Sequence, residues 1–64
     1  MSEWISLKKE RPGDEHDGRY LIIYTWSSAR LNFIVEADIW LGSQFEFWGD
    51  KVSHWMLLPE PPDA

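Results

Sequence analysis

The sequence predicts an all-β (β-dominated) fold, a small curled antiparallel meander of about four to five strands with its N- and C-terminal segments packed together. Two observations support this prediction. Apolar runs rich in β-branched and aromatic residues follow one another between short turn segments, and the middle of the chain alternates with a period of two. A chain of 64 residues forms one domain. We therefore expect a single domain over residues 1–64, with residues 59–64 as an extended, proline-rich tail.

The small size of the chain limits the core that it can bury. A domain of this length buries only roughly 60% of its unfolded surface, and small folds usually need disulfides, a metal or a partner subunit. The sequence contains no cysteine, which excludes disulfides and thiolate zinc sites. It contains five Trp, three Phe and two Tyr, which are hard to hide in so small a domain. Aromatic packing, oligomerisation or both are therefore expected to stabilise the fold.

The chain is acidic, with a formal net charge of −5 at pH 7. This charge argues against binding to nucleic acid or to an anionic membrane, which requires clustered Lys and Arg, but it permits a basic protein partner. The only basic cluster, Lys8, Lys9 and Arg11, is interrupted by Glu10. No apolar run approaches the roughly 20 residues of a membrane span, and the N-terminus lacks the layout of a signal peptide. We expect a cytoplasmic protein.

The first half of the chain is predicted to contain an amphiphilic segment, a polar loop and a strand. Residues 4–7 are expected to add a fifth strand or to pack across one end of the sheet. Residues 12–19 are predicted to form a loop, because Pro and Gly punctuate a run of mostly acidic residues. Residues 20–26 are predicted to form the first long strand. Both parities of this run are apolar, which predicts a strand covered on both faces.

The next run, residues 31–40, alternates with the period of a half-buried strand. One parity combines aliphatic and aromatic residues, and the other carries the acids. A strand of this kind is expected to turn its uncharged parity toward the core. The core-facing set is then Leu31, Phe33, Val35, Ala37 and Ile39.

Two shorter runs complete the predicted sheet. Residues 45–48 alternate again and predict a strand with both Phe side chains inward. Residues 52–58 predict the last strand, which ends where the prolines begin. On this interpretation Phe33, Val35 and Phe47 are inaccessible, and Phe33→Ala leaves the chain largely unfolded.

The two ends of the chain resemble a known family. The chain opens with Trp4-Ile5-Ser6-Leu7 and closes with Val52-Ser53-His54-Trp55-Met56, followed by Leu58-Pro59-Glu60-Pro61-Pro62. These motifs are similar to those of the domain of unknown function 551 family, short proteins found largely in tailed phages and prophages. The segment from Ala37 to Phe45 is similar to the middle hairpin of that family, so the resemblance spans nearly the whole chain.

The resemblance implies a phage protein made in the cytoplasm of the bacterial host. It implies no catalytic residues, because none is known for the family. The sequence departs from the family at Leu57, where the family usually has a proline. We therefore expect the last strand to pair two residues further in this chain.

No set of residues points to catalysis, and we expect no enzyme, no cofactor and no metal. Asp14-Glu15-His16-Asp17 contains metal-ligating residue types, but neighbouring residues on a loop rarely converge on one ion, so a solvated turn is favoured. His54 lies within the last predicted strand. A structural histidine is favoured there over a general base, since no Ser, Cys or carboxylate lies at a spacing that marks a triad.

The surplus of aromatic residues points to protein binding instead. Trp4 and Trp55 are expected to share one core cluster. Trp26, Trp40 and Trp48 fall on the parity or at the strand ends that should be exposed, and exposed Trp is enriched at protein interfaces. We predict a partner-binding surface on the outward parity of the second and third strands. Its members are Ile34, Glu36, Asp38, Trp40, Glu46 and Trp48.

The sequence thus favours a small phage-encoded accessory protein that binds a host protein and modulates or inhibits it, for example within a defence system. Two alternatives stay open. The first is a structural homodimer whose extra rings cover one another, and the second is a small-ligand or metal-binding module that uses His16, His54 and the acidic loop. A weaker hypothesis is that Glu36, Asp38 and Glu46 imitate a phosphate backbone.

Overall fold

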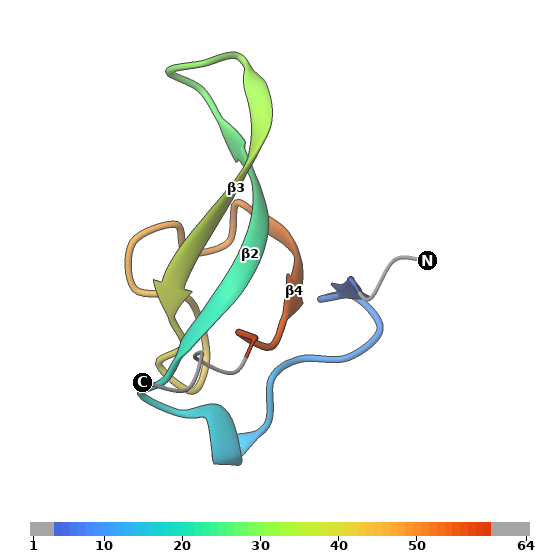
Figure 1. Ribbon diagram of the computed structural model, residues 1–64, viewed down its shortest axis with the longest axis vertical. Helices are drawn as coiled ribbons and strands as arrows, with labels where there is room; N and C mark the ends of the chain where they lie inside the picture. The colour runs from blue at the N-terminus through green and yellow to red at the C-terminus, as the bar shows by residue number, and fades with distance from the viewer. Residues whose placement is uncertain (1–3, 60–64) are drawn as a thin grey trace.

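The computed structural model describes residues 4–59 and shows a four-stranded antiparallel sheet (Figure 1). The strands are β1 (Ile5–Ser6), β2 (Tyr20–Ser27), β3 (Asn32–Ile39) and β4 (Val52–Met56), and their order in the sheet is β1-β4-β2-β3. A single turn of 3-10 helix, η1 (Asp14–His16), lies between β1 and β2. The predicted all-β fold is confirmed. The predicted packing of the two ends is also confirmed, because β1 pairs with β4.

The β2–β3 hairpin is the longest element of the fold. Its register runs without interruption from Tyr20 opposite Ile39 to Ser27 opposite Asn32. The turn between the strands is held by a hydrogen bond from the Arg30 N–H to the Ser27 hydroxyl. In Figure 1 the closed end of this hairpin extends beyond β4 and beyond the loop that follows β3. On the core side, cover nevertheless reaches the end of β2, because Thr25 and Ser27 are buried.

The predicted strand at residues 45–48 does not form, and the sheet is not a simple meander. β4 pairs with β2, on the side opposite β3. Residues 45–48 instead belong to a loop with isolated bridges of Phe45 to Trp40 and to Gly49, and its Glu46 N–H donates to the Ile39 carbonyl of β3. The backbone N–H groups of Phe47 and Trp48 donate to the Asp38 carboxylate instead of to a neighbouring strand. A side chain thus satisfies the donors that a ladder would have used.

The C-terminal strand is also shorter than predicted. β4 ends at Met56, and the following residues Leu57 and Leu58 are exposed and unpaired within residues 4–59. The expected extension of the last strand past Leu57 is therefore wrong. The predicted tail falls almost wholly on residues 60–64, which lie outside the described residues; Pro59 itself is exposed.

The core lies on one face of the sheet. The chain between β1 and β2 and the loop between β3 and β4 cover it. The Trp55 indole N–H donates to the Glu10 carbonyl at 2.9 Å, and this bond holds the chain between β1 and β2 against the core. Ile5, Leu7 and Trp48 pack against its margin. The buried hydrophobic residues are Leu21, Ile23, Trp40, Phe45, Val52 and Trp55.

The prediction of which β3 parity faces the core is wrong. Phe33 is 42% exposed, Val35 is 58% exposed and Phe47 is 78% exposed, so none of the three is inaccessible. The parity that does point toward the core side contains Asp38 and Trp40, which are buried. The alternation correctly defined two faces of the strand. It did not reveal which face the loops would cover, because that depends on residues distant in the sequence.

Trp4 and Trp55 do not share a cluster. Trp55 is buried in the core, where it lies opposite both Ile5 and Ile23 in the sheet. Trp4 lies one residue before Ile5 and packs on Tyr24, with ring centroids 5.7 Å apart. Successive side chains of a strand point to opposite faces, so the pairing of β1 with β4 separates the two rings.

The exposure of Phe47 leads to a prediction of a null effect. Phe47 contacts Trp48 edge to face, but most of its side chain is in solvent. We expect Phe47→Ala to change the free energy of unfolding by less than about 0.5 kcal/mol, as is usual for surface substitutions. Urea denaturation followed by circular dichroism measures this change. A loss comparable to that of a core Phe would mean that the loop packs more tightly than the structure shows.

Candidate functional site

The face of the sheet opposite the core is apolar, and residues 4–59 cover it only in part. Strand pairing places Ile22 beside both Ala37 and Met56, and places Tyr24 beside both Val35 and His54. None of the residues on this face carries an Asp, Glu, Lys or Arg side chain. We call this surface the outer face. Its strand members are Ser6, Tyr20, Ile22, Tyr24, Trp26, Phe33, Val35, Ala37, Ile39, His54 and Met56.

Aromatic rings form a connected cluster on the outer face. Tyr24 and Phe33 are stacked, with centroids 4.9 Å apart and an interplanar angle of 6°. Trp26 meets Phe33 edge to face at 5.3 Å, and His54 meets Tyr24 in the same way at 6.2 Å. Trp4 completes the cluster by its contact with Tyr24. Each ring is held by another from a neighbouring strand or segment, so the cluster presents a preorganised surface.

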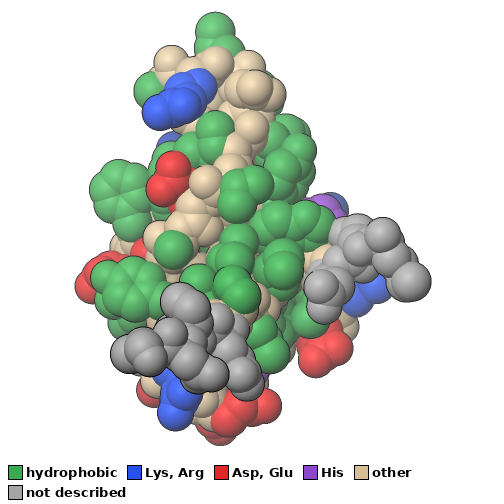
Figure 2. All heavy atoms as spheres, in the orientation of Figure 1, with side chains coloured by type: hydrophobic (Ala, Val, Ile, Leu, Met, Phe, Trp, Pro, Cys, Tyr) green, Lys and Arg blue, Asp and Glu red, His purple; other side chains and the backbone are tan. Residues whose placement is uncertain are grey.

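Much of the outer face is accessible to solvent. Tyr20, Trp26, Phe33 and Val35 are each exposed. Figure 2 shows hydrophobic side chains in a broad band over the strands of the sheet, with few charged groups between them. Contiguous exposed apolar patches are uncommon on soluble monomers and usually mark a binding surface. The two apolar parities of β2 predicted a strand covered on both faces, but within residues 4–59 only the parity of Leu21 and Ile23 is buried.

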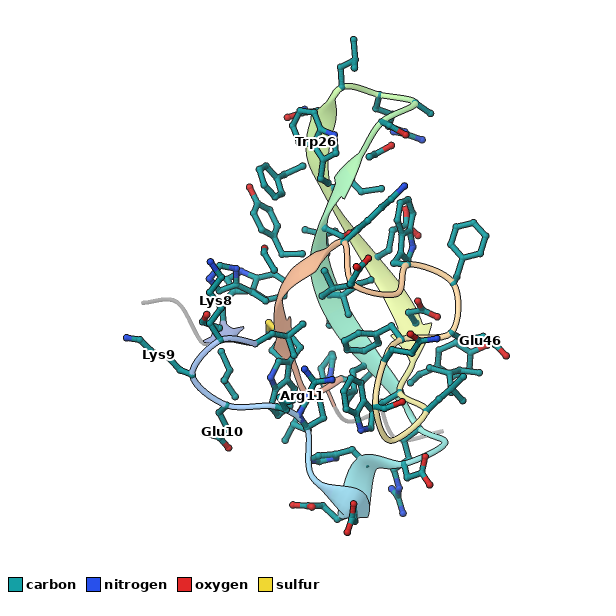
Figure 3. All side chains as sticks on the ribbon, turned by 180° about the vertical axis from the view of Figure 1, so that it is seen from behind. Lys8, Lys9, Glu10, Arg11, Trp26 and Glu46 are labelled. Atoms are coloured by element: carbon teal, nitrogen blue, oxygen red, sulfur yellow. The ribbon has the colours of Figure 1, made fainter. Side chains whose placement is uncertain are left out.

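The surface predicted from the sequence lies on the other side of the sheet, and the structure does not expose it as one face. Asp38 and Trp40 are buried, and Ile34 and Trp48 are half-buried. Only Glu36 and Glu46 are exposed, the first on the sheet and the second on the loop that covers the core (Figure 3). The uncharged parity of β3, which contains Phe33 and Val35, forms part of the exposed outer face. From the sequence this parity was interpreted as core.

The basic segment Lys8–Arg11 lies apart from Trp26, as the labels in Figure 3 show. Arg11 has a structural role there, because its guanidinium lies 5.2 Å from the centroid of the Trp40 ring and donates to the Ser43 carbonyl. Lys8 and Lys9 are exposed, and Lys9 points away from the sheet (Figure 3). The one short basic run in the sequence therefore splits into a core-covering residue and two solvated lysines.

The two histidines are held by separate parts of the fold. His16 packs on Trp55 with ring centroids 5.7 Å apart, on the core side. His54 lies on the outer face, and its Nδ1 is 2.8 Å from the Ser53 hydroxyl. Within residues 4–59, no three His, Asp or Glu side chains are grouped so that they could hold a metal ion. The acidic loop and the histidines thus do not form one site.

In the part of the chain that the structure describes, no helix has the length and apolar character to cross a membrane.

Comparisons with known proteins identify a family. Neither the curated proteins nor the solved structures contain a match to this chain. One family model, described as a protein of unknown function (DUF551), matches residues 3–63. The match covers almost the whole sequence, and the chain therefore belongs to the DUF551 family.

Proposed function

We propose that this protein binds another protein through its outer face, and that binding rather than catalysis is its role. The observation that carries the proposal is the connected cluster of Trp4, Tyr24, Trp26 and Phe33 on the outer face, in which Trp26 and Phe33 are exposed. Trp and Tyr are enriched among the residues that dominate binding free energies at interfaces. Rings that already pack on one another lose little side-chain entropy when a partner covers them.

A different protein fits this surface better than a second copy does. The chain carries a net charge of −5, so two copies repel each other at long range, whereas a basic partner is attracted. Acids also lie close to the outer face, with Glu36 on the same strand as Phe33 and Val35. The resemblance to phage and prophage proteins extends the proposal. The partner is then a protein of the bacterial host cytoplasm, and covering its surface modulates or inhibits it.

Two exposed phenylalanines on opposite sides of the sheet offer a matched test. Benzoylphenylalanine, a photoreactive and nearly isosteric analogue, is placed either at Phe33 on the outer face or at Phe47 on the core-covering loop. Both proteins are irradiated in bacterial lysate. We expect a discrete heterologous adduct from the Phe33 position and none from the Phe47 position. The additional change Trp26→Ala should weaken this adduct at least about thirtyfold, the effect of losing an interface hot spot.

Three outcomes would contradict the proposal. Equal labelling from both positions, or no adduct from either, would mean that the outer face is not a specific binding surface. An adduct at twice the mass of the chain, together with a concentration-dependent mass in sedimentation, would assign the outer face to a homodimer instead.

A further inference from the structure

The edge of the sheet formed by β3 is open between Phe33 and Ile39. β3 pairs with β2 on one side and with no strand of residues 4–59 on the other. The Trp40 N–H donates to the Arg19 carbonyl and the Trp40 carbonyl accepts the Gly18 N–H, so the backbone groups of Trp40 point toward the chain that leads into β2, across a one-residue bulge. The backbone groups of successive residues alternate in direction along a strand. The backbone groups of Phe33, Val35, Ala37 and Ile39 therefore point away from β2, toward the edge.

Within residues 4–59, the chain hydrogen-bonds only to the two ends of this edge. The Ile39 carbonyl accepts the Glu46 N–H at 2.9 Å, and the Ile39 N–H donates to the Asp38 side chain. At the other end the Phe33 N–H donates to the Asn32 side chain. Val35 and Ala37 lie between these points, and their outward N–H and C=O groups have no partner within residues 4–59. An exposed strand edge of this kind is a template for another strand.

The side chains next to the open edge define what an added strand must carry. Phe33, Val35 and Ala37 place apolar side chains on the outer face, so alternate residues of the added strand must be apolar. Glu36 is exposed on the opposite face, between Val35 and Ala37. A Lys or Arg in the added strand would pair with its carboxylate. A second copy fits poorly, because no symmetric pairing centred on Val35, Glu36 or Ala37 gives Glu36 a cationic partner: its side chain lies opposite Ile34, Glu36 or Asp38 of the other copy.

We infer that the β3 edge binds an extended segment of the partner protein, apolar at alternate positions and with a Lys or Arg facing Glu36, which joins the sheet as a fifth strand. This inference rests on the proposed function and specifies how the partner engages: its backbone bonds to Val35 and Ala37, and its apolar side chains extend the outer face. Backbone hydrogen bonds to the edge fix the direction and register of the added strand, and contact with the aromatic cluster buries apolar surface of the partner.

A designed peptide tests the edge directly. The probe is a blocked nonapeptide of alternating valine and threonine in which the central threonine is replaced by lysine. We expect the full-length protein to bind it with slowed amide hydrogen exchange at Val35 and Ala37 and unchanged exchange in β4. A variant peptide with glutamate in place of lysine should bind about two- to fivefold more weakly, and the protein variant Glu36→Lys should reverse this preference.

Methylation of the peptide backbone separates edge addition from simple contact with the outer face. In an antiparallel addition the valine N–H groups face β3, and in a parallel addition the threonine N–H groups do. Methylating the nitrogens of one residue type should therefore weaken binding by about tenfold or more, while methylating the other type should leave it nearly unchanged. The sensitive residue type reports the strand direction.

Three results would overturn the inference: equal binding by both methylated peptides, an unchanged charge preference in Glu36→Lys, or no slowed exchange at Val35 and Ala37 with the peptide at about 1 mM. None of them bears on the photocrosslink from the Phe33 position. If that adduct forms while the peptide fails, the partner covers the outer face without adding a strand. If the adduct also fails, the proposed function fails with it.

Discussion

Trp40→Ala is expected to unfold the domain. The Trp40 side chain is 1% exposed, packs edge to face on Phe45 at 5.0 Å and is covered by the Arg11 guanidinium. Truncating a buried Trp to Ala typically costs about 3–5 kcal/mol. A single core of this size rarely supplies more than about 3–5 kcal/mol of net stability. Near-ultraviolet circular dichroism of the variant should therefore lack the tertiary signal of the native protein, and urea should produce no cooperative transition.

Trp26→Ala is the matched control for this experiment, since it removes the same side chain from the opposite face of the sheet. Trp26 is exposed and contacts Phe33 on the outer face. We expect this variant to remain folded, with a loss of about 1 kcal/mol or less. If Trp40→Ala retained a cooperative transition close to that of the native protein, the covered side of the sheet would not be the core.

Asp38→Asn should destabilise the fold by roughly 3 kcal/mol although it preserves the shape of the side chain. Asp38 is 5% exposed, and one carboxylate oxygen accepts the backbone N–H groups of Phe47 and Trp48 at 3.0 and 2.9 Å. The other oxygen accepts the Ile39 N–H at 2.8 Å. An amide nitrogen cannot accept a hydrogen bond, so in either orientation the NH₂ group of Asn faces backbone N–H donors, those of the loop or that of Ile39, and leaves them without a partner.

Urea denaturation measures the change in stability, and amide exchange at Phe47 and Trp48 reports whether the loop has detached. Glu36→Gln is the control, because it makes the same kind of change two residues earlier on the same side of β3, where the side chain is exposed. We expect it to alter stability by less than about 0.5 kcal/mol. An Asp38→Asn variant with native stability and protected loop amides would show that the carboxylate does not hold the loop.

The sequence by itself determined the fold class, the positions of the long strands and the family. β2 and β3 are predicted from β-forming residues and a period of two, which are local properties of the chain. The packing of the two chain ends was also predicted, with a strand or a plug at residues 4–7 as alternatives, and the structure shows the strand as the β1–β4 ladder. The abundance of aromatic residues correctly indicated that the domain could not hide all of its rings.

Only the tertiary structure decided which face of β3 became the core. Alternation divides a strand into two faces, but the covered face is chosen by segments far away in the sequence. Here the loop after β3 folds over the parity that contains Asp38 and Trp40, because the Asp38 carboxylate binds the backbone of that loop and Phe45 packs on Trp40. A charged residue thus faces inward as a loop anchor, and the uncharged parity with Phe33 and Val35 is left in solvent.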